Sequence, residues 1–379
     1  MPVFGTRPEA IKLAPVIREL RSRPEEFETV LVVTAQHRSM LDQVLKVFEI
    51  EPDHDLDLMQ HGQTLAQVTS RALEGVQALV EQCRPDLVLV QGDTTTVFAG
   101  ALAAFYCQVA VGHVEAGLRT SNKYNPYPEE MNRRLTTALA DLHFAPTPQA
   151  RDNLLREGVP SERLYVTGNT VIDALLSAKD RAKPAAQPTG RMLLVTAHRR
   201  ENLGEPMREI CLGVSDLVHR FSDVRVVFAM HLNPKVRETV RGVLGGHDRV
   251  DLIEPPDYGD FVALMTQAHL ILTDSGGVQE EAPALGKPVL VLRTTTERPE
   301  GVTAGTAKLV GPDRAAIVQS AAELLSDSTA YESMSQAANP YGDGRASQRI
   351  AAALLHHFRG APRPADWVGR VKVVETPAS

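Results

Sequence analysis

Short apolar stretches rich in β-branched residues recur along the chain, and most are followed by helix-like patterns. Such continuous runs are typical of strands that are buried on both faces of a parallel sheet, whereas half-exposed strands alternate apolar and polar positions. The pattern predicts strands over residues 31–34, 87–90, 109–112, 192–196, 224–229, 270–273 and 288–292.

Two stretches carry the helical period especially clearly. Residues 10–20 place five apolar side chains on one face, which predicts an amphipathic helix: Ala10, Leu13, Ala14, Ile17 and Leu20. A second helix is predicted to begin at Pro128, and its apolar face repeats at Met131, Leu135, Ala138 and Leu142. Strands that alternate with helices predict a doubly wound α/β fold.

The chain has 379 residues, which is too many for one ordinary core and suits two domains. Residues 178–190 are rich in Ala, Pro and Lys and lack periodicity, so they read as a surface loop near a domain boundary. We therefore expect two Rossmann-like halves, residues 1–168 and 169–345, and a tail of little pattern over 359–379.

Composition narrows the class of protein. Hydrophobic residues make up 43% and charged residues 23%, which favours a folded globule. The formal net charge of −7 argues against a general nucleic-acid or membrane-surface binder, but an anionic small substrate needs only a few placed cations. The sequence shows no bilayer-length apolar run and no signal-peptide pattern, and its three cysteines form no CxxC pair, so we expect a cytoplasmic protein.

Nearly every polar cluster directly follows a predicted strand. These clusters are residues 5–9, 92–96, 113–117, 198–201, 231 and 274–277. Ligands of open α/β sheets bind beyond the carboxyl ends of the strands. The clusters of both halves are therefore expected to line one cleft between the domains.

Two of these clusters suit an anion. Arg7 stands at a strand–helix corner, where it either clamps a phosphate or is an ordinary surface side chain. Gly276 and Gly277 open a helix whose free N–H groups and dipole suit a diphosphate, with Ser275 as a further donor. Glu281, one turn on, can accept from ribose hydroxyls. The alternative is a glycine-rich turn capped by Asp274 or Ser275.

Four residues are acid–base candidates, and each also has a structural explanation. Asp93 can cap the helix that follows it, and Glu115 can pair with Arg119. Glu129 lies in a first helical turn, where a carboxylate is favourable by roughly 0.3–1 kcal/mol, and His198 can be a hydrogen-bonded loop residue. Singly the structural explanations are preferred, but four such groups at strand ends or adjoining loops favour an active site.

Several common motifs are missing from the sequence. It has no GxGxxG after a strand, no GxxxxGK[ST], no HExxH, no GxSxG and no Cys/His zinc spacing. The sequence therefore supports no dinucleotide cofactor and no metal, and we expect side chains alone to perform the chemistry.

The ordered set of motifs resembles the bacterial non-hydrolysing UDP-N-acetylglucosamine 2-epimerases. The similarity covers about residues 3–358, and it rests on residues 3–12 (VFGTRPEAIK), 92–96, 112–120, 128–133, 198–201, 274–282, 296–300 and 339–344. The resemblance implies two Rossmann-like domains as in GT-B glycosyltransferases, a helix at about 346–358 that packs back on the first domain, and a homodimer. It also implies interconversion of UDP-GlcNAc and UDP-ManNAc for cell-envelope polysaccharides, with neither NAD nor metal.

The mechanism that the resemblance implies is anti elimination of UDP to give 2-acetamidoglucal, followed by re-addition of UDP with the proton on the opposite face of C2. By similarity, Asp93, Glu115 and Glu129 are the carboxylate candidates, and His198 contacts the diphosphate or assists proton movement. The residues carried over as ligands of UDP or substrate are Arg7, Lys12, Phe261, Ser275, Gly276, Gly277, Glu281 and Arg298.

Family members can also hold a second UDP-GlcNAc that activates the enzyme. The positions that match this activator pocket are Gln36, Gln63, Glu129, Arg199 and His231. Three departures from the family pattern stand out. The first strand is short, Pro256 replaces a glutamine near the uracil, and Gly62 replaces an arginine before Gln63, so one cation for the activator's phosphates is missing.

Three other functions remain open at this stage. A GT-B glycosyltransferase shares the fold but needs an acceptor, and a hydrolysing epimerase releases free ManNAc and UDP. A non-catalytic nucleotide-sugar sensor fits less well, because carboxylates would oppose the binding of an anion.

Overall fold

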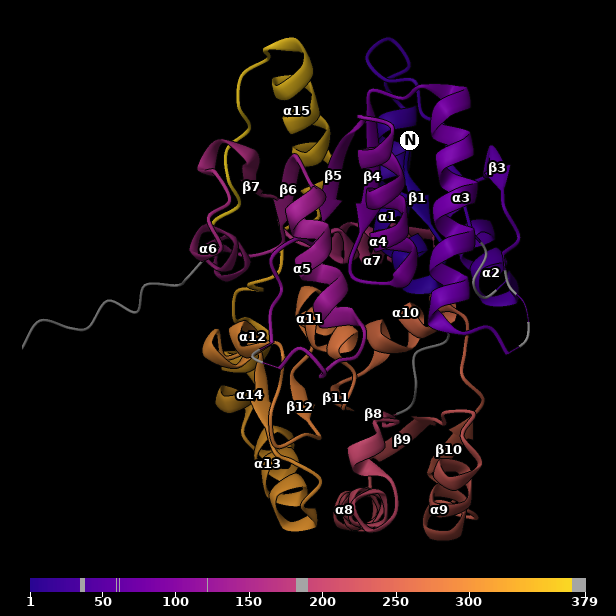
Figure 1. Cartoon of the computed structure of the whole chain (residues 1–379). Helices are drawn as coiled ribbons and strands as arrows, with labels where there is room; N and C mark the ends of the chain where they lie inside the picture. Colours follow the sequence, from indigo (N-terminus) through magenta and orange to yellow (C-terminus); the bar gives the residue numbers. More distant parts are fainter. Residues whose placement is uncertain (35–37, 59, 61, 121, 182–189, 370–379) are drawn as a thin grey trace, which may run out of the picture. The chain divides into compact units, whose positions relative to one another are not determined.

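The computed structural model describes residues 1–34, 38–58, 60, 62–120, 122–181 and 190–369. The chain folds into two compact units, Met1–Ser177 with Gly342–Val368, and Ala178–Tyr341 (Figure 1). The first unit therefore continues past the boundary expected at residue 168, as far as Ser177. It also includes the later stretch Gly342–Val368. Asp173 helps to join the two stretches of this unit, because it accepts hydrogen bonds from the backbone N–H groups of Ala346 and Ser347, at 3.1 and 2.8 Å.

The first unit is built on parallel strands. They are β1 (Val3–Phe4), β2 (Val32–Val33), β3 (His54–Asp55), β4 (Leu87–Gln91), β5 (Ala110–Val114), β6 (Leu142–Ala145) and β7 (Leu164–Val166). They form two sheets, β1-β2-β3 and β4-β5-β6-β7. The N–H of Leu89 donates to the carbonyl of Met1 at 2.9 Å, so β1 lies beside β4 and the strands run 3-2-1-4-5-6-7.

Helices cover these strands. They are α1 (Arg7–Arg21), α2 (Arg38–Phe48), α3 (Leu65–Cys83), α4 (Thr95–Tyr106), α5 (Glu129–Leu139), α6 (Pro148–Arg156), α7 (Thr170–Arg181) and α15 (Ala346–Arg359), with a 3-10 turn at Ser161–Arg163. The apolar face predicted for residues 10–20 is buried in α1, and α15, yellow in Figure 1, packs against α1. Pro8 suits the first turn of α1, where its missing N–H costs nothing.

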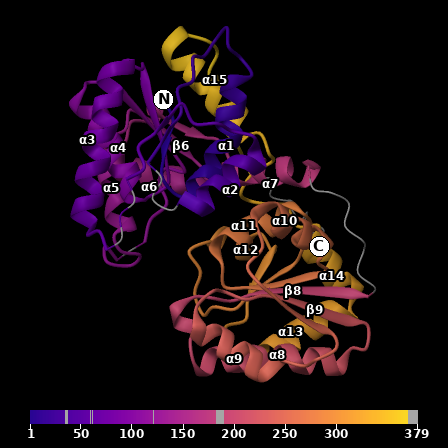
Figure 2. The same ribbon diagram turned by 90° about the vertical axis from the view of Figure 1, so that its right-hand side faces the viewer.

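The second unit has one parallel sheet in the order β10-β9-β8-β11-β12-β13. Its strands are β8 (Arg191–Thr196), β9 (Val224–Ala229), β10 (Val250–Ile253), β11 (Leu270–Thr273), β12 (Val289–Val291) and β13 (Ala307–Leu309). Its helices are α8 (Glu205–Arg220), α9 (Pro234–Leu244), α10 (Tyr258–Gln267), α11 (Gly276–Ala284), α12 (Pro299–Thr303), α13 (Arg314–Ser326) and α14 (Ser328–Ser335), with a 3-10 turn at Arg200–Asn202. Figure 2 shows α8, α9 and α13 on one face of the sheet and α10, α11 and α12 on the other.

These two units confirm the predicted doubly wound α/β class. Central strands such as β4 and β11 were predicted within a residue, because they are buried on both faces. Two expectations were wrong. Leu142 begins β6 instead of continuing α5, and residues 178–181 are the last turn of α7 instead of loop. In the stretch that shows little sequence pattern after α15, the N–H of Trp367 donates to the carbonyl of Val166 in β7. The criterion of continuous apolar runs missed β3, β6, β7, β10 and β13, most of which contain a polar or charged residue.

No helix in the described ranges is long and apolar enough to cross a membrane.

Candidate active site

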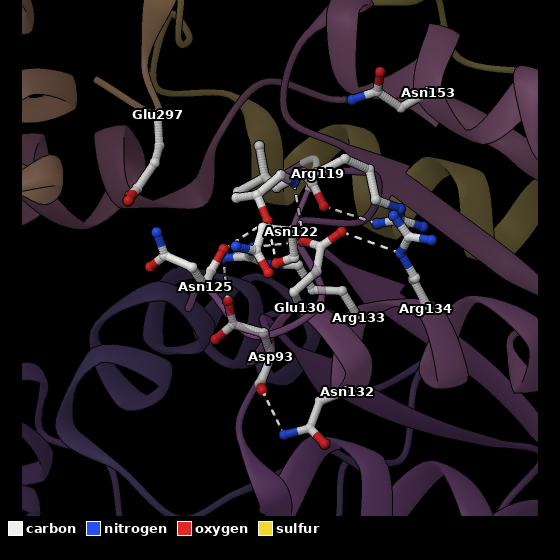
Figure 3. Close-up of polar contacts among 12 residues, drawn as sticks. Asp93, Arg119, Asn122, Asn125, Glu130, Asn132, Arg133, Arg134, Asn153 and Glu297 are labelled. Atoms are coloured by element: carbon white, nitrogen blue, oxygen red, sulfur yellow. Dashed lines mark hydrogen bonds and ion pairs between the residues drawn. The ribbon is translucent and has the colours of Figure 1, made fainter. Parts of the chain in front are cut away.

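Asp93 follows β4 and is held by α5. Thr94, not Asp93, caps α4, since its hydroxyl accepts from the N–H of Val97 at 3.3 Å. The Asp93 carboxylate instead pairs with Arg133, with 2.5 Å between Oδ2 and the guanidinium, and Asn132 donates to the Asp93 carbonyl at 2.9 Å (Figure 3). The capping explanation for Asp93 is therefore wrong, and its carboxylate is oriented by a cation.

Glu115 follows β5 and has a left-handed backbone, with φ +64°. A non-glycine residue rarely adopts this conformation, and such strain persists where the surroundings fix it. Its carboxylate accepts from the Gln91 amide at 2.5 Å and forms an ion pair with Lys12. Arg119 pairs with Glu157 at 2.7 Å. The structure thus joins Lys12 and Glu115, which the resemblance had named separately.

The turn between β1 and α1 presents Arg7. The conformation of Gly5 is not left-handed, but a Cβ there would lie 2.2 Å from the Thr34 hydroxyl, so close packing is the reason for glycine. Glu9 is 1% exposed and accepts from the N–H groups of Gly5 and Thr6 at 3.2 and 2.7 Å. Arg7 itself is exposed at the first residue of α1.

Glu9 also accepts from the hydroxyl of Thr94 at 2.8 Å. One buried carboxylate therefore joins the turn that carries Arg7 to the turn that carries Asp93. Burial raises the pKa of Glu9 to about 7, and the hydrogen bonds that it accepts oppose this shift.

Glu129 is the first residue of α5 and is half-buried. Its Oε2 atom is buried and makes no hydrogen bond among the described residues. A buried carboxylate oxygen without a donor is costly, so this atom is suited to accept from a ligand.

His113 is a fully buried residue that the sequence reasoning did not single out. Its Nε2–H donates to the carbonyl of Gly92 at 2.7 Å, which fixes the turn just before Asp93. Burial lowers the pKa of His113 to about 4, so the ring is neutral near pH 7. The cluster at 113–117 gave no local sign of this role, because the contact joins β5 to the end of β4.

In the second unit, Asp274 organises the loop after β8. It is fully buried, and its Oδ2 accepts from the N–H groups of His198 and Arg199, both at 2.9 Å, and from Asn202 at 2.8 Å. The Nδ1 atom of His198 lies 3.3 Å from Oδ1 of Asp274. Burial lowers the pKa of His198, and the neighbouring carboxylate opposes this. Asp274 is therefore a positioning group and not a helix cap.

The predicted phosphate loop opens α11 at Gly276. Ser275 is the N-cap, but its side chain makes no capping hydrogen bond, so the capping alternative is wrong for both residues considered. A Cβ at Gly277 would meet no atom closer than 3.9 Å, so packing inside the protein does not require glycine at this position. This helix start has the donors and the dipole that suit an anion.

The predicted nucleoside contacts lie around the same helix. Glu281 is 6% exposed and accepts from the hydroxyl of Tyr258 at 2.8 Å. Burial and the Glu281 carboxylate raise the pKa of Tyr258. Phe261 is half-buried in the same helix as Tyr258, and Arg298 forms an ion pair with Glu280. Sequence reasoning missed Tyr258, because a tyrosine that begins a helix gives no sign of its partner.

The activator positions do not all lie in the described part of the chain. Gln36 falls outside the described residues. Gln63 uses both ends of its amide locally, donating to the Leu58 carbonyl at 3.0 Å and accepting from the Gln60 N–H at 2.9 Å. In the second unit, the ring of His231 stacks on that of His198 with centroids 5.4 Å apart, and Arg199 lies beside Gly276.

Among the described residues, no group of three or more His, Cys, Asp or Glu side chains is arranged to hold a metal ion.

Comparison with known proteins identifies the family. The family model described as UDP-N-acetylglucosamine 2-epimerase matches residues 18–355. The chain belongs to this family. The UDP-N-acetylglucosamine 2-epimerase of Bacillus subtilis (strain 168) is 59% identical over 362 residues, which cover 94% of this chain and 95% of that protein. The resemblance inferred from the ordered motifs is thereby confirmed.

Solved structures agree with the family assignment. The UDP-GlcNAc 2-epimerase of Neisseria meningitidis, solved with UDP-GlcNAc bound, is 49% identical with a TM-score of 0.86, covering 93% of this chain and 98% of that one. The glycotransferase of kitacinnamycin aligns with a TM-score of 0.62 at 14% identity, covering 93% and 97%. That second likeness shows a shared fold alone, as expected for a GT-B-like architecture.

Proposed function

We propose that this chain catalyses the reversible epimerisation of UDP-GlcNAc to UDP-ManNAc at C2. One carboxylate takes the C2 proton, the C1–O bond breaks, and UDP leaves with the electron pair to give 2-acetamidoglucal. UDP then adds back at C1 while a proton is delivered to the opposite face of C2. Family membership supports the activity. The observation that carries the mechanism is the set of three carboxyl groups of the first unit, Asp93 and Glu115 just after strands and Glu129 at the start of α5.

The three carboxylates have different surroundings, which suits different roles. Glu115 faces an ammonium and an amide, Asp93 faces a guanidinium, and Glu129 keeps one oxygen without a donor. A general acid and a general base typically contribute 10²–10⁴-fold each, so the placement of these groups is expected to govern turnover. Lys12 and Arg7 are proposed to contact the substrate from the same unit.

The second unit is proposed to hold UDP. The start of α11, with Ser275, Gly276 and Gly277, would bind the diphosphate, and His198 would stabilise it as it departs. Glu281 would accept from the ribose hydroxyls, next to Tyr258. Phe261 would lie near the uracil, and Arg298 would contact UDP or substrate from the loop before α12.

The experiment is proton NMR of UDP-GlcNAc with the purified protein in D2O, without NAD, added metal or acceptor. We expect partial conversion to UDP-ManNAc with deuterium at C2 of both sugars. Conversion with the C2 proton fully retained, after internal return is excluded, would contradict the elimination. Free ManNAc with UDP would indicate a hydrolysing enzyme, and a requirement for an acceptor would indicate a glycosyltransferase.

Three further features belong to the same proposal. The protein acts as a homodimer in the cytoplasm, and its product supplies cell-envelope polysaccharide synthesis. A second UDP-GlcNAc activates it through Gln36, Gln63, Glu129, Arg199 and His231. Arginine can bind phosphate with two parallel hydrogen bonds, and the Nε atom of Arg199 is buried without a partner among the described residues.

A further inference from the structure

Glu130, the second residue of α5, is a fully buried carboxylate to which the proposed mechanism gives no role. It accepts from the N–H of Thr120 at 3.0 Å, from Arg133 at 3.2 Å and from Nε of Arg134 at 3.1 Å. A buried charge is costly unless it is paired and hydrogen-bonded. These donors offset that cost, and they fix the position of the Glu130 carboxylate.

Arg133 connects the Glu130 carboxylate to Asp93. One arm of its guanidinium donates to Glu130, and the other lies 2.5 Å from Oδ2 of Asp93 (Figure 3). The Arg133 side chain is 12% exposed, whereas that of Asp93 is 26% exposed. A guanidinium is a planar, rigid fork, so fixing one arm also fixes the direction of the other. Glu130 and Arg133 lie three positions apart on α5, a spacing that brings side chains together on one helix face.

Arg134 provides the contrast within the same cluster. It also donates to Glu130, but its side chain is 46% exposed and lies away from Asp93 in Figure 3. Arg133 and Arg134 therefore each form one ion pair with Glu130, and Arg133 in addition forms an ion pair with Asp93.

We propose that Arg133 and Glu130 are positioning residues for Asp93. Glu130 orients the guanidinium of Arg133, and Arg133 holds the Asp93 carboxylate in the direction from which it moves a proton at C2. This inference rests on the proposed function, in which Asp93 serves one face of C2. A proton-transfer group has to lie within hydrogen-bond reach of its target, and a small misplacement can cost on the order of 10²-fold in rate.

General damage to the fold would slow both outcomes of the reaction alike, whereas misplacing one proton-transfer group would not. Protonation of 2-acetamidoglucal from one face gives UDP-GlcNAc and from the other gives UDP-ManNAc. If Arg133 orients the group that serves one face, loosening Asp93 slows one of these outcomes more than the other. In D2O this changes the early ratio of C2 deuterium in UDP-GlcNAc to that in UDP-ManNAc.

The test compares Arg133→Met with the matched control Arg134→Met in the full chain. Methionine replaces the aliphatic part of each arginine with an unbranched apolar side chain and removes the charged guanidinium. We expect Arg133→Met to lower kcat by about tenfold to 100-fold with KM for UDP-GlcNAc within roughly threefold, since positioning acts on the chemical step. We also expect its deuterium ratio to move by roughly threefold or more, while Arg134→Met stays within about twofold in every quantity.

Two more variants keep the test decisive if Arg133→Met folds poorly. Arg133→Lys keeps the charge without the second arm, so it is expected to keep the thermal midpoint and still shift the deuterium ratio. Glu130→Gln keeps the side-chain shape and is expected to shift the ratio in the same direction. The double variant Glu130→Gln with Arg133→Met is expected to shift the ratio little more than Arg133→Met alone, because both changes act through the contact between Arg133 and Asp93.

Failure of the positioning role can be distinguished from failure of the proposed function. If the unmodified protein makes UDP-ManNAc but the arginine variants slow it equally with an unchanged deuterium ratio, the cluster only holds α5 in place and the inference is wrong. If the unmodified protein makes no UDP-ManNAc, the proposed function fails and the inference falls with it.

Discussion

At the scale of single residues, the first unit contains a buried carboxyl group that is held by several hydrogen bonds. Glu9 is the clearest case, because its carboxylate joins the turns that carry Arg7 and Asp93 and is almost completely buried. Burial opposes ionisation of this group, while the donors around it favour ionisation. The pKa of about 7 means that the two tendencies do not cancel and that burial prevails.

We predict that Glu9 makes folding stability depend on pH between about 4.5 and 7. Its folded pKa is raised from 4.5 to about 7, so the folded state retains a proton that the unfolded state has already lost. The contribution is fully present below pH 4.5 and is lost as pH rises through 7, by an amount on the order of 3 kcal/mol. Urea unfolding at pH 5 and pH 8 measures this loss.

The variant Glu9→Gln isolates the effect, since it keeps the shape and cannot ionise. The difference in unfolding free energy between the variant and the unmodified protein should change with pH in this window. Gln67 lies at the same position of an exposed capping box in α3, so Gln67→Glu is the matched control and should show no such change. An equal pH dependence with and without Glu9 would contradict the prediction.

At the scale of elements, the C-terminal segment completes the first unit. The N-cap of α15, Arg345, makes no side-chain capping hydrogen bond, and Asp173 of α7 accepts from the first N–H groups of α15 instead. After α15, the N–H of Trp367 donates to the Val166 carbonyl at 2.6 Å, and Asp366 accepts from the Val166 N–H at 2.9 Å. These contacts cover β7, and an uncovered strand edge invites pairing with other chains.

We predict that Asp173→Ala releases α15 locally. The change removes acceptors from buried N–H groups, which typically costs about 1–3 kcal/mol. Hydrogen exchange of residues 346–359 should therefore accelerate, while that of β8 to β13 stays unchanged. Asp313→Ala, which removes the conventional cap of α13, is the control and should loosen α13 without affecting α15. Unchanged protection of α15 in Asp173→Ala would contradict this account.

At the scale of the whole molecule, two units with the same parallel winding each place polar side chains after their strands. The same architecture at 14% identity belongs to a glycotransferase, so the architecture does not select the reaction. The side chains at the ends of the strands therefore have to select the reaction.

We predict that the reverse reaction, started from UDP-ManNAc alone, shows a lag that a trace of UDP-GlcNAc removes. Gly62→Arg should lower the concentration of UDP-GlcNAc needed, because a charge-assisted hydrogen bond is worth about 1.5–3 kcal/mol. Gly62 has φ +76°, so any side chain there strains the backbone, and Gly62→Ala is the matched control for that strain. Full reverse rate without a lag would show that no activator acts here.

The sequence by itself determined the fold class, the central strands and the family. It did so because burial on both faces leaves short, continuous apolar runs, and because the strand-end motifs keep their order along the chain. Asp93, Glu115 and His198 were recognised as candidates from their positions after strands, although local sequence could not say what holds them.

Only the tertiary structure decided the partners. Lys12 meets Glu115 across 103 positions of sequence, and Asp173 meets Ser347 across 174 positions. Periodicity reports how each segment is buried, but hydrogen bonds between distant side chains depend on how the strands are ordered in a sheet. For the same reason the sequence could not show that Asp274, considered there as a possible cap, holds the backbone of His198. Nor could it show that Arg133, which had no assigned role, pairs with Asp93.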